Sequence, residues 1–406
     1  MSMDDLSKPE PAARDPRPAP DDNTPRAVAA RLAAGFAATA AARDEAGGTA
    51  RAERDALRAS GLLALAIPGE FGGQGADWRT TLDTVRTIAR ADSSLGHVYG
   101  FQHLLLATVR LFARPAQWQP WFEQTAANRW FWGNALNPLD TRTVAEAVPG
   151  GRRFDGRKSF CSGATDSDML IVSGHKPEGG LVIGAVPTRR AGIRLLDDWN
   201  NIGQRQTDSG GAVLDGLFIA DDELLLDPGP LSTPFACLRP LIAQLVFCNV
   251  FLAQAEGAVE AARGYTREQT RLWPGSAGPT VLEDPYILRH YGDYFAALEA
   301  GRVLTDRAAD RLDEAWARAE TLDEAGRGEV ALAVATAKVT TTRLALELTS
   351  RIFEVAGARA TTAALRLDRF WRNVRVQTLH DPLDMKLREL GNWALNDRYP
   401  APSFYS

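Results

Sequence analysis

The stretch GRRFDGRKSFCSGATDSDMLIVSG, residues 151–174, carries the strongest fold signal in the chain. Its apolar run MLIVSG at 169–174 is followed by LVIGAVP at 181–187 and GAVLDGLFI at 211–219, with Gly, Pro and Asp between the runs. Short apolar runs bounded by such turn residues are typical of β-strands. The spacing predicts a β-domain of roughly 80 residues, from 144 to about 225.

Helical patterns lie on both sides of this β-domain. Before it, residues 27–60 and 78–133 carry apolar residues at helical spacing. After it, long helical patterns cover 239–272, 285–320 and 329–356. Three helices of such length favour an antiparallel bundle.

The order of these patterns predicts an α+β protein in four parts. The parts are a disordered tail at 1–25, an N-terminal helical domain at 26–133, a middle β-domain at 134–228 and a C-terminal helical bundle at 229–406. The tail prediction rests on six prolines among charged residues, because such a segment buries too little apolar surface to order itself. Two helical blocks around a compact β block is an uncommon order that narrows the choice of folds.

Composition excludes several function classes. The net charge is −5 and long Lys/Arg runs are absent, which argues against a nucleic-acid partner. The polar, acidic start MSMDDLSKPE is unlike a targeting peptide. The most apolar helical run, 241–253, is interrupted by Gln244 and Asn249 and is too short to span a bilayer. A cytoplasmic location without membrane attachment is expected.

Cysteine and histidine usage argues against disulfides and metals. The three cysteines show no CxxC spacing, so a reducing compartment is expected. The five histidines form no pattern with zinc-ligand spacing. No metal is therefore predicted.

Three segments in the right order resemble the acyl-CoA dehydrogenase family. LLALAIPGEFGGQGAD at 62–77 is similar to the segment between the second and third helices of that family. Residues 151–174 resemble its first β-hairpin, where a Gly-x-Lys-x-aromatic run meets the flavin, and 253–273 resemble the first long bundle helix. The resemblance covers about 27–400 and implies an N-terminal helical domain, a middle β-barrel or sandwich and a C-terminal antiparallel four-helix bundle.

Within that family, the chain most resembles reduced-flavin monooxygenases of the dibenzothiophene monooxygenase type. The segments that carry this resemblance are KSFCSGATDSD (158–168), DDWNNIGQRQTDSG (197–210), TREQTRLW (266–273), EDPYILRHYGDY (283–294), DRFWRNVRVQTLHDP (368–382) and RYPAPSF (398–404). The resemblance implies a two-component enzyme that uses reduced FMN and O2, through a C4a-hydroperoxyflavin, to oxygenate a heteroatom. The sulfur of an aromatic thioether such as dibenzothiophene is the first expectation.

Three departures from the dehydrogenase pattern agree with this choice. The Tyr-Glu-Gly-Thr run that holds the dehydrogenase base reads TLHD at 378–381 here, without a carboxylate at the matching position. The Gln-x-x-Gly-Gly-x-Gly loop for the adenine half of FAD reads FEVAGAR at 353–359. The Thr-Glu-Pro-x-Ala-Gly-Ser-Asp signature is replaced by NALNP at 134–138. An arginine gained in the 353–359 loop suits a flavin that ends in a phosphate, so FMN is expected rather than FAD.

The resemblance also implies the site residues. The catalytic set is His97, Asn134, Ser162 and His380, which would face the flavin and the oxygen adduct. The cofactor-binding set is Phe101, Asn134, Phe160, Ser162, Trp199, Arg271, Arg359 and His380, with the two arginines at the phosphate. The residues alone leave other interpretations open: a turn serine, a helix-capping Asn, a core His or Trp, and arginines in surface salt bridges.

One position departs from the dibenzothiophene enzyme, which has a tyrosine where this chain has Phe101. The lost hydroxyl removes a hydrogen bond near the oxygen or substrate site, and His103 is a possible polar substitute. Dibenzothiophene itself is therefore in question. An N-hydroxylase, an alkyl-sulfone monooxygenase, an FAD-dependent acyl-CoA dehydrogenase and a silent scaffold are the alternatives.

Partners follow from the same resemblance. No GxGxxG unit for a nicotinamide nucleotide is present, so a separate NAD(P)H-flavin reductase is the expected source of reduced FMN. The substrate is expected to be small and apolar. A homotetramer is usual in the family, and the aromatic end of the chain, 399–405, is expected to dock on a neighbouring subunit.

Overall fold

The computed structural model describes residues 22–268 and 271–406. The predicted tail therefore lies outside the described residues, except for its last four. Within these, Thr24 accepts a hydrogen bond from the backbone N–H of Ala27 and caps the first helix, whose first residue is Pro25.

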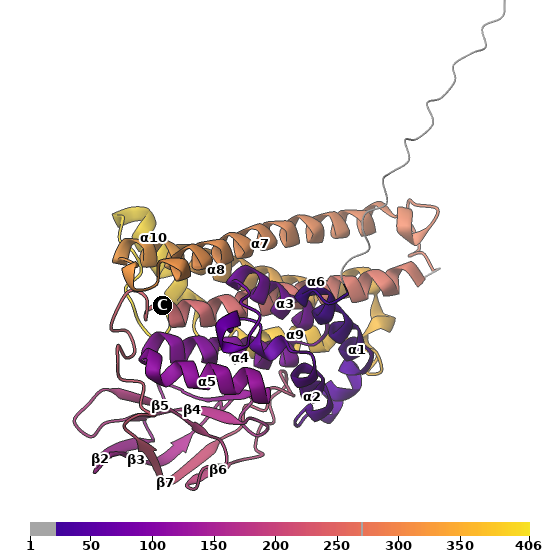
Figure 1. Ribbon diagram of the computed structural model, residues 1–406. Coiled ribbons are helices and arrows are strands. Elements are labelled where there is room, and N and C mark those ends of the chain that lie inside the picture. Colours follow the sequence, from indigo (N-terminus) through magenta and orange to yellow (C-terminus); the bar gives the residue numbers. More distant parts are fainter. Residues whose placement is uncertain (1–21, 269–270) are drawn as a thin grey trace, which may run out of the picture.

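The N-terminal part is helical. Its helices are α1 (Pro25–Ala46), α2 (Arg51–Ala59), α3 (Trp78–Ala91), α4 (Ser93–Phe112) and α5 (Pro115–Asn128). Asp77 and Asp92 cap α3 and α4 through their side chains. In α4 every residue except Arg110 is buried, and a helix apolar all round belongs in a core. It lies between the β-domain and the C-terminal helices (Figure 1).

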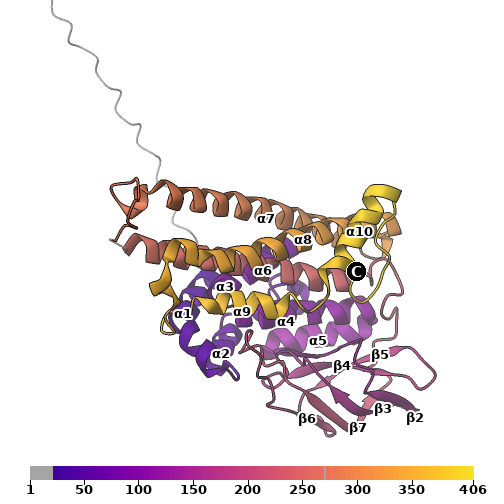
Figure 2. The ribbon, with the colours of Figure 1, turned by 180° about the vertical axis from the view of Figure 1, so that it is seen from behind.

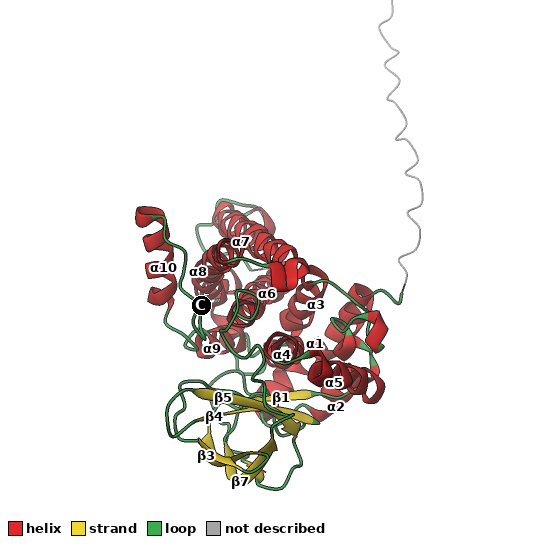
Figure 3. Cartoon of the chain, turned by 60° about the vertical axis from the view of Figure 1, so that its left-hand side comes forward, coloured by secondary structure: helices red, strands yellow, loops and turns green. Residues whose placement is uncertain are grey.

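The middle part is one curled sheet of seven strands. The strands are β1 (Trp132–Ala135), β2 (Val144–Val148), β3 (Gly151–Lys158), β4 (Met169–His175), β5 (Leu181–Pro187), β6 (Ile193–Leu195) and β7 (Ala212–Ala220). Their order is β1-β4-β2-β3-β7-β6, with β5 on β4. Figure 3 shows β1, β4 and β5 on the side of the helices.

Alternation along β4 divides the core in two. Met169 and Ile171 pack with the helices, whereas Leu170 and Val172 belong to a separate core inside the curl of the sheet. Successive side chains of a strand point to opposite faces, so one strand serves both cores. The β-domain is thereby packed against the helices.

Long helices form the C-terminal part. They are α6 (Leu238–Glu268), α7 (Pro285–Arg318), α8 (Glu324–Ala356), α9 (Asp368–Gln377) and α10 (Leu383–Asn396). The first three agree closely with the predicted helical patterns. Together with the helical N-terminal part and the β-domain, they confirm the predicted α+β, acyl-CoA dehydrogenase-like fold.

The length argument against a membrane span was wrong. Among the residues that the structure describes, α6 is the one helix long and apolar enough to cross a bilayer, because it continues well beyond the apolar run 241–253. However, 89% of its most apolar window is buried inside the protein. A core helix of a folded protein has this property.

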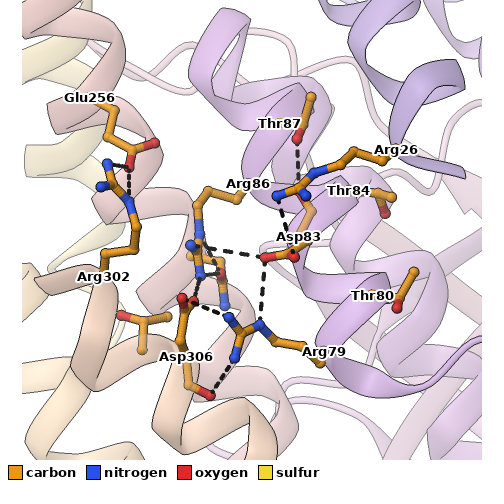
Figure 4. Close-up of polar contacts among 12 residues, drawn as sticks. Arg26, Arg79, Thr80, Asp83, Thr84, Arg86, Thr87, Glu256, Arg302 and Asp306 are labelled. Carbon is orange, nitrogen blue, oxygen red and sulfur yellow. Dashed lines mark hydrogen bonds and ion pairs between the residues drawn. The ribbon is translucent and has the colours of Figure 1, made fainter. Parts of the chain in front are cut away.

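Charged side chains join the N-terminal helices to the bundle (Figure 4). Arg79 and Arg86 of α3 both contact Asp306 of α7, at 2.7 and 2.6 Å. Arg302 of α7 contacts Glu256 of α6 at 2.7 Å. Several partly buried partners sharing one carboxylate form a network, which contributes more than isolated surface pairs.

The helices α3, α4 and α6 pack closely around Gly100. A Cβ added there would lie 2.5 Å from Cγ1 of Val246 and 3.3 Å from Cγ1 of Val85. We expect Gly100→Ala to lower the free energy of unfolding by about 1–3 kcal/mol through overpacking. Gly264→Ala in α6, where an added Cβ meets nothing within 4 Å, should instead stabilise by about 0.5–1 kcal/mol. Denaturant unfolding measures the change in the free energy of unfolding for each variant. Equal changes in the two variants would contradict the packing argument.

Candidate active site

Four rings from three elements form the centre of the site. His97 and Phe101 follow each other by one turn of α4 and are stacked, with centroids 4.2 Å apart. Phe247 of α6 lies 5.7 Å from each of them. His380, just beyond the end of α9, lies 4.7 Å from Phe247. The structure thus brings together both predicted catalytic histidines and Phe101.

Burial keeps the His97 imidazole neutral. Desolvation, with a smaller contribution from the nearby His380, lowers the pKa of His97 to about 3. The amide Nε2 of Gln377 lies 2.6 Å from His97 Nδ1. Since an amide nitrogen only donates, Nδ1 accepts and the proton of the neutral ring is on Nε2. This Nε2 is buried and has no hydrogen-bond partner among the described residues.

Gln377 is a site residue that the sequence argument missed. It lies within the quoted 368–382 segment, but nothing in the sequence links it to a helix 280 residues earlier. In the structure α9 passes close to α4, and Gln377 is 5% exposed. The Gln377 side chain orients the His97 ring through this hydrogen bond. A histidine that only fills the core would have no such partner.

His380 is held by a buried ion pair. Its Nδ1 lies 3.1 Å from Oδ1 of Asp381, and this same oxygen is 3.4 Å from Nζ of Lys338 on α8. Asp381 and Lys338 were both missed from the sequence. Asp381 follows the position of the absent dehydrogenase glutamate, but it is paired and is not a free base.

Ser162 and Asn134 are adjacent on the β-domain side. The backbone N–H of Asn134 donates to the carbonyl of Ser162 at 3.0 Å. Ser162 Oγ is 2.7 Å from Ser209 Oγ, which donates to Thr207 at 2.8 Å. Asn134 lies in strand β1, so the helix-capping interpretation is wrong. Thr207 donates to the carbonyl of Gln204 and Ser209 donates to Thr207, so the Ser162 hydroxyl donates to Ser209. Its oxygen can still accept a hydrogen bond from a ligand.

Phe160 and Trp199 form the open edge of this side. Phe160 is 60% exposed and has φ of +58°, an uncommon conformation for a bulky residue. Its ring meets Trp199 edge-on at 6.1 Å, and the Trp199 indole donates to the carbonyl of Gln204 at 2.7 Å. Strain of this kind concentrates at ligand sites.

The two sides of the site meet along the first turns of α4. Gln204 donates through Nε2 to Ser93 Oγ at 3.0 Å and through its backbone N–H to Asn373 Oδ1 at 2.7 Å. Ser93 is one turn before His97, and Asn373 is one turn before Gln377. The loop that carries Trp199 is therefore tied to the helices that carry the histidine pair.

Arg271 and Arg359 lie elsewhere in the chain. Arg271 follows α6 and Arg359 follows α8, and both are exposed. The ends of these helices meet where Thr266 donates to the carbonyl of Val355 at 3.4 Å. From Phe247 to Thr266, α6 rises roughly 30 Å, which exceeds the length of FMN. Figures 1 and 2 show this end of the bundle opposite the chain's C-terminus. Within one chain the two arginines are not brought to the predicted site.

His103 does not replace the missing tyrosine hydroxyl. Two residues after Phe101 on a helix, it points to a different face, where its ring meets Tyr99 edge-on at 4.8 Å. Burial lowers the pKa of His103 to about 3, and neither ring nitrogen has a hydrogen-bond partner among the described residues.

The end of the chain contacts its own subunit. The carbonyl of Tyr405 accepts from Lys386 Nζ at 2.6 Å, and that of Pro400 accepts from Arg327 at 2.6 Å. The Tyr405 ring lies 5.6 Å from His380, so the tail borders the site. Segment 399–405 could contact a neighbouring subunit only through its exposed side chains. Docking of this segment on another subunit stays a prediction.

Comparisons with family models and with a related protein show the family to which the chain belongs. Residues 20–129 match the model of the acyl-CoA dehydrogenase N-terminal domain, and residues 245–385 match that of the C-terminal domain. Over 393 residues the chain is 60% identical to the probable FMNH2-dependent monooxygenase SfnC of Pseudomonas putida, covering 96% of this chain and 100% of that protein. The chain belongs to the acyl-CoA dehydrogenase family. Within the family it belongs to the branch of FMNH2-dependent monooxygenases.

Two further comparisons describe this branch. The chain is 42% identical over 398 residues to the dibenzothiophene monooxygenase of Mycolicibacterium goodii, covering 94% of this chain and 96% of that one. The solved structure of the methanesulfinate monooxygenase MsuC of Pseudomonas fluorescens has a TM-score of 0.93 and 62% identity, covering 94% of this chain and 100% of that one. The predicted family and monooxygenase branch are thus confirmed.

The residues present fit a flavin better than a metal. Among the described residues, no group of three or more His, Cys, Asp or Glu could hold a metal ion. The buried, unpartnered Nε2 of His97 needs a partner, and the exposed ring of Phe160 offers apolar contact to a planar ligand. Both features suit a flavin ring placed between α4 and the β-domain.

Proposed function

We propose that the protein uses reduced FMN and O2 to oxygenate the sulfur of a small organosulfur compound. The observation that carries the proposal is the neutral His97, whose unpartnered Nε2 lies in the same ring cluster as His380. A dehydrogenase needs a carboxylate base that takes a proton from carbon. Asp381, the carboxylate that follows His380 in the chain, is paired with Lys338.

Each side of the site has its own part in this proposal. When bound, reduced FMN supplies two electrons to O2, so that one oxygen atom goes to sulfur and the other leaves as water. Ser162 and Asn134 would hydrogen-bond the polar edge of the flavin ring, and Phe160 with Trp199 would cover its face. His97 would donate a hydrogen bond from Nε2 to the oxygen, while Phe101 and Phe247 exclude water.

Among sulfur compounds, we propose a small alkyl sulfinate as the substrate class and an aromatic thioether as the second candidate. The identity of 62% to a methanesulfinate monooxygenase, against 42% to a dibenzothiophene monooxygenase, supports this order. Phe101 supports it too, because the resemblance places a tyrosine at this position in the dibenzothiophene enzymes. An alkyl sulfone and an N-hydroxylation substrate rank below these.

A substrate panel tests the proposal. Purified protein, a flavin reductase, NADH and FMN are incubated in air with methanesulfinate, dimethyl sulfone or dibenzothiophene, and the products are scored by mass. We expect methanesulfinate to gain one oxygen at the highest kcat/KM. Turnover of dibenzothiophene alone would reverse the ranking, and acyl-CoA-dependent dye reduction with bound FAD would contradict the proposal.

The electron donor and the assembly are part of the same proposal. A separate NAD(P)H-flavin reductase supplies reduced FMN, and the protein acts in the cytoplasm without nucleic-acid or membrane partners. A homo-oligomer, for which a tetramer is expected, is supported by the exposed apolar side chains on α7. These are Tyr286, Leu288, Phe295 and Val303. Arg271 and Arg359 would then meet the phosphate of a flavin bound by a neighbouring subunit.

Losing these arginines should weaken flavin binding. We expect Arg359→Ala and Arg271→Ala each to raise the Kd for FMN about 10-fold or more, because a charge-assisted bidentate contact to phosphate is lost. Arg343→Ala, on the middle of the exposed face of α8, is the control and should leave the Kd unchanged. Fluorescence titration with riboflavin separates the effects, because riboflavin lacks the phosphate and its Kd should not change in any variant. An equal loss for FMN and riboflavin would contradict the phosphate assignment.

A further inference from the structure

A buried ion pair connects the core of the bundle to His380. Lys338 is 1% exposed and stands over the rings of Phe247 and Phe251, 4.9 Å from each centroid. Its Nζ lies 3.4 Å from Oδ1 of Asp381, which is 6% exposed. Neither charge reaches bulk water, so the two depend on each other and on the groups around them.

The ion pair determines the charge of Asp381. Burial acts to raise the pKa of the Asp381 carboxyl, but the Lys338 ammonium and contacts from His380 and Gln244 outweigh burial and hold the pKa well below its usual range. The carboxylate is therefore ionised and can only accept hydrogen bonds. Its Oδ1 lies 3.1 Å from His380 Nδ1, so Nδ1 carries a proton.

We propose that Lys338 and Asp381 are positioning residues that fix His380 as its Nδ1-protonated tautomer. Nε2 then remains an acceptor on a ring that is 40% exposed. His97 is fixed in the opposite sense, because the Gln377 amide donates to its Nδ1 and leaves the proton on Nε2. One imidazole of the site therefore donates and the other accepts. The role of the two imidazoles in oxygenation rests on the proposed function. The tautomer of His380 does not, because it follows from the contacts with Asp381 and Lys338.

A purely structural role explains the ion pair less well. Replacing a buried pair by apolar residues of similar size is often neutral or stabilising, so the pair is not required for packing alone. Asp381 also keeps its second oxygen, Oδ2, without a hydrogen-bond partner among the described residues. Its other oxygen, Oδ1, meets both His380 Nδ1 and Lys338 Nζ, so the ion pair is joined directly to the imidazole. The hydrogen bond that one ring nitrogen makes determines which nitrogen carries the proton.

The test uses flavin-free protein labelled with 15N-histidine, which gives signals from only five residues. A His380→Gln variant assigns the His380 signals in the NMR spectrum. We expect a protonated Nδ1 and an unprotonated Nε2 in the unaltered protein. In the Lys338→Met variant, His380 should show a mixture of both tautomers. The double variant Lys338→Met/Asp381→Leu, in which an apolar pair replaces the ion pair, should show the same mixture. Arg86→Met, which breaks a partly buried ion pair away from the site, is the control and should leave the His380 signals unchanged.

Two outcomes would overturn the proposal. One is an unchanged His380 tautomer in both the Lys338→Met and the double variant, and the other is an equal change in Arg86→Met. With the reductase present, the same variants should lose on the order of 10-fold in kcat for product, with KM for FMN unchanged. Because the NMR measurement needs no turnover, a failed sulfur oxygenation would leave the tautomer result intact and separate the two proposals.

Discussion

His97→Leu is expected to lower product formation about 100-fold or more, because a positioned imidazole typically contributes 10²–10⁴ in rate. Oxygen consumption should continue with hydrogen peroxide as its main product. The physical reason is that Nε2 of His97, in the ring cluster of the site, is a buried donor without a partner among the described residues, so its removal leaves the oxygen without that hydrogen bond. Coupled assays of product and peroxide measure both quantities.

The chain provides a matched control for this prediction. His103 lies on the same helix, is also buried, and has its pKa lowered by burial to about 3 as well. It contacts Tyr99 and belongs to a different face of α4. His103→Leu should keep the ratio of product to peroxide. If both variants lost coupling to the same extent, the change would reflect the packing of α4 rather than the chemistry of His97.

The second large effect is on stability. Arg54 of α2 is fully buried and reaches the loop beside Ser162. Its Nη2 donates to the carbonyl of Gly163 at 2.7 Å, and its Nε is 3.2 Å from Asp166 Oδ2. We expect Arg54→Met to lower the free energy of unfolding by about 3–5 kcal/mol, because it leaves a buried carboxylate, Asp208, without its cation. Denaturant unfolding measures this loss.

Arg51→Met is the control for Arg54→Met. Arg51 lies on the same helix and contacts the same Asp166 at 3.9 Å, but its side chain is 69% exposed. Its loss should change the free energy of unfolding by less than about 1 kcal/mol. Similar losses in the two variants would mean that burial of Arg54 does not determine its contribution. Flavin affinity should fall in Arg54→Met alone, since that residue positions the 163–166 loop.

The fold was largely predictable because its signals are local. Strand runs around 169–187 and helical spacing over 239–356 depend on residues near each other in the chain. The division into two cores on either side of β4 was not predictable. Alternation along the strand does not show which face packs against the helices and which lies inside the curl of the sheet. The tail's return to its own subunit, with Tyr405 beside His380, depends on contacts across the bundle.

The site was predictable only for residues within recognisable segments. His97, Ser162 and His380 follow from the resemblance, and the structure brings His97 and His380 into one cluster. Gln377 and Lys338, which hold the two histidines, belong to helices that meet only in the folded protein. Neither has a sequence signal of its own.

The most direct test of the central claim follows the oxygen atom. The protein is mixed with FMN that has been reduced in advance, methanesulfinate and 18O2, and the product is analysed by mass spectrometry. The account predicts one 18O atom in each molecule of methanesulfonate, with an equal amount of FMN oxidised. Recovery of all the 18O as hydrogen peroxide, with methanesulfinate, dimethyl sulfone and dibenzothiophene each unchanged, would contradict it.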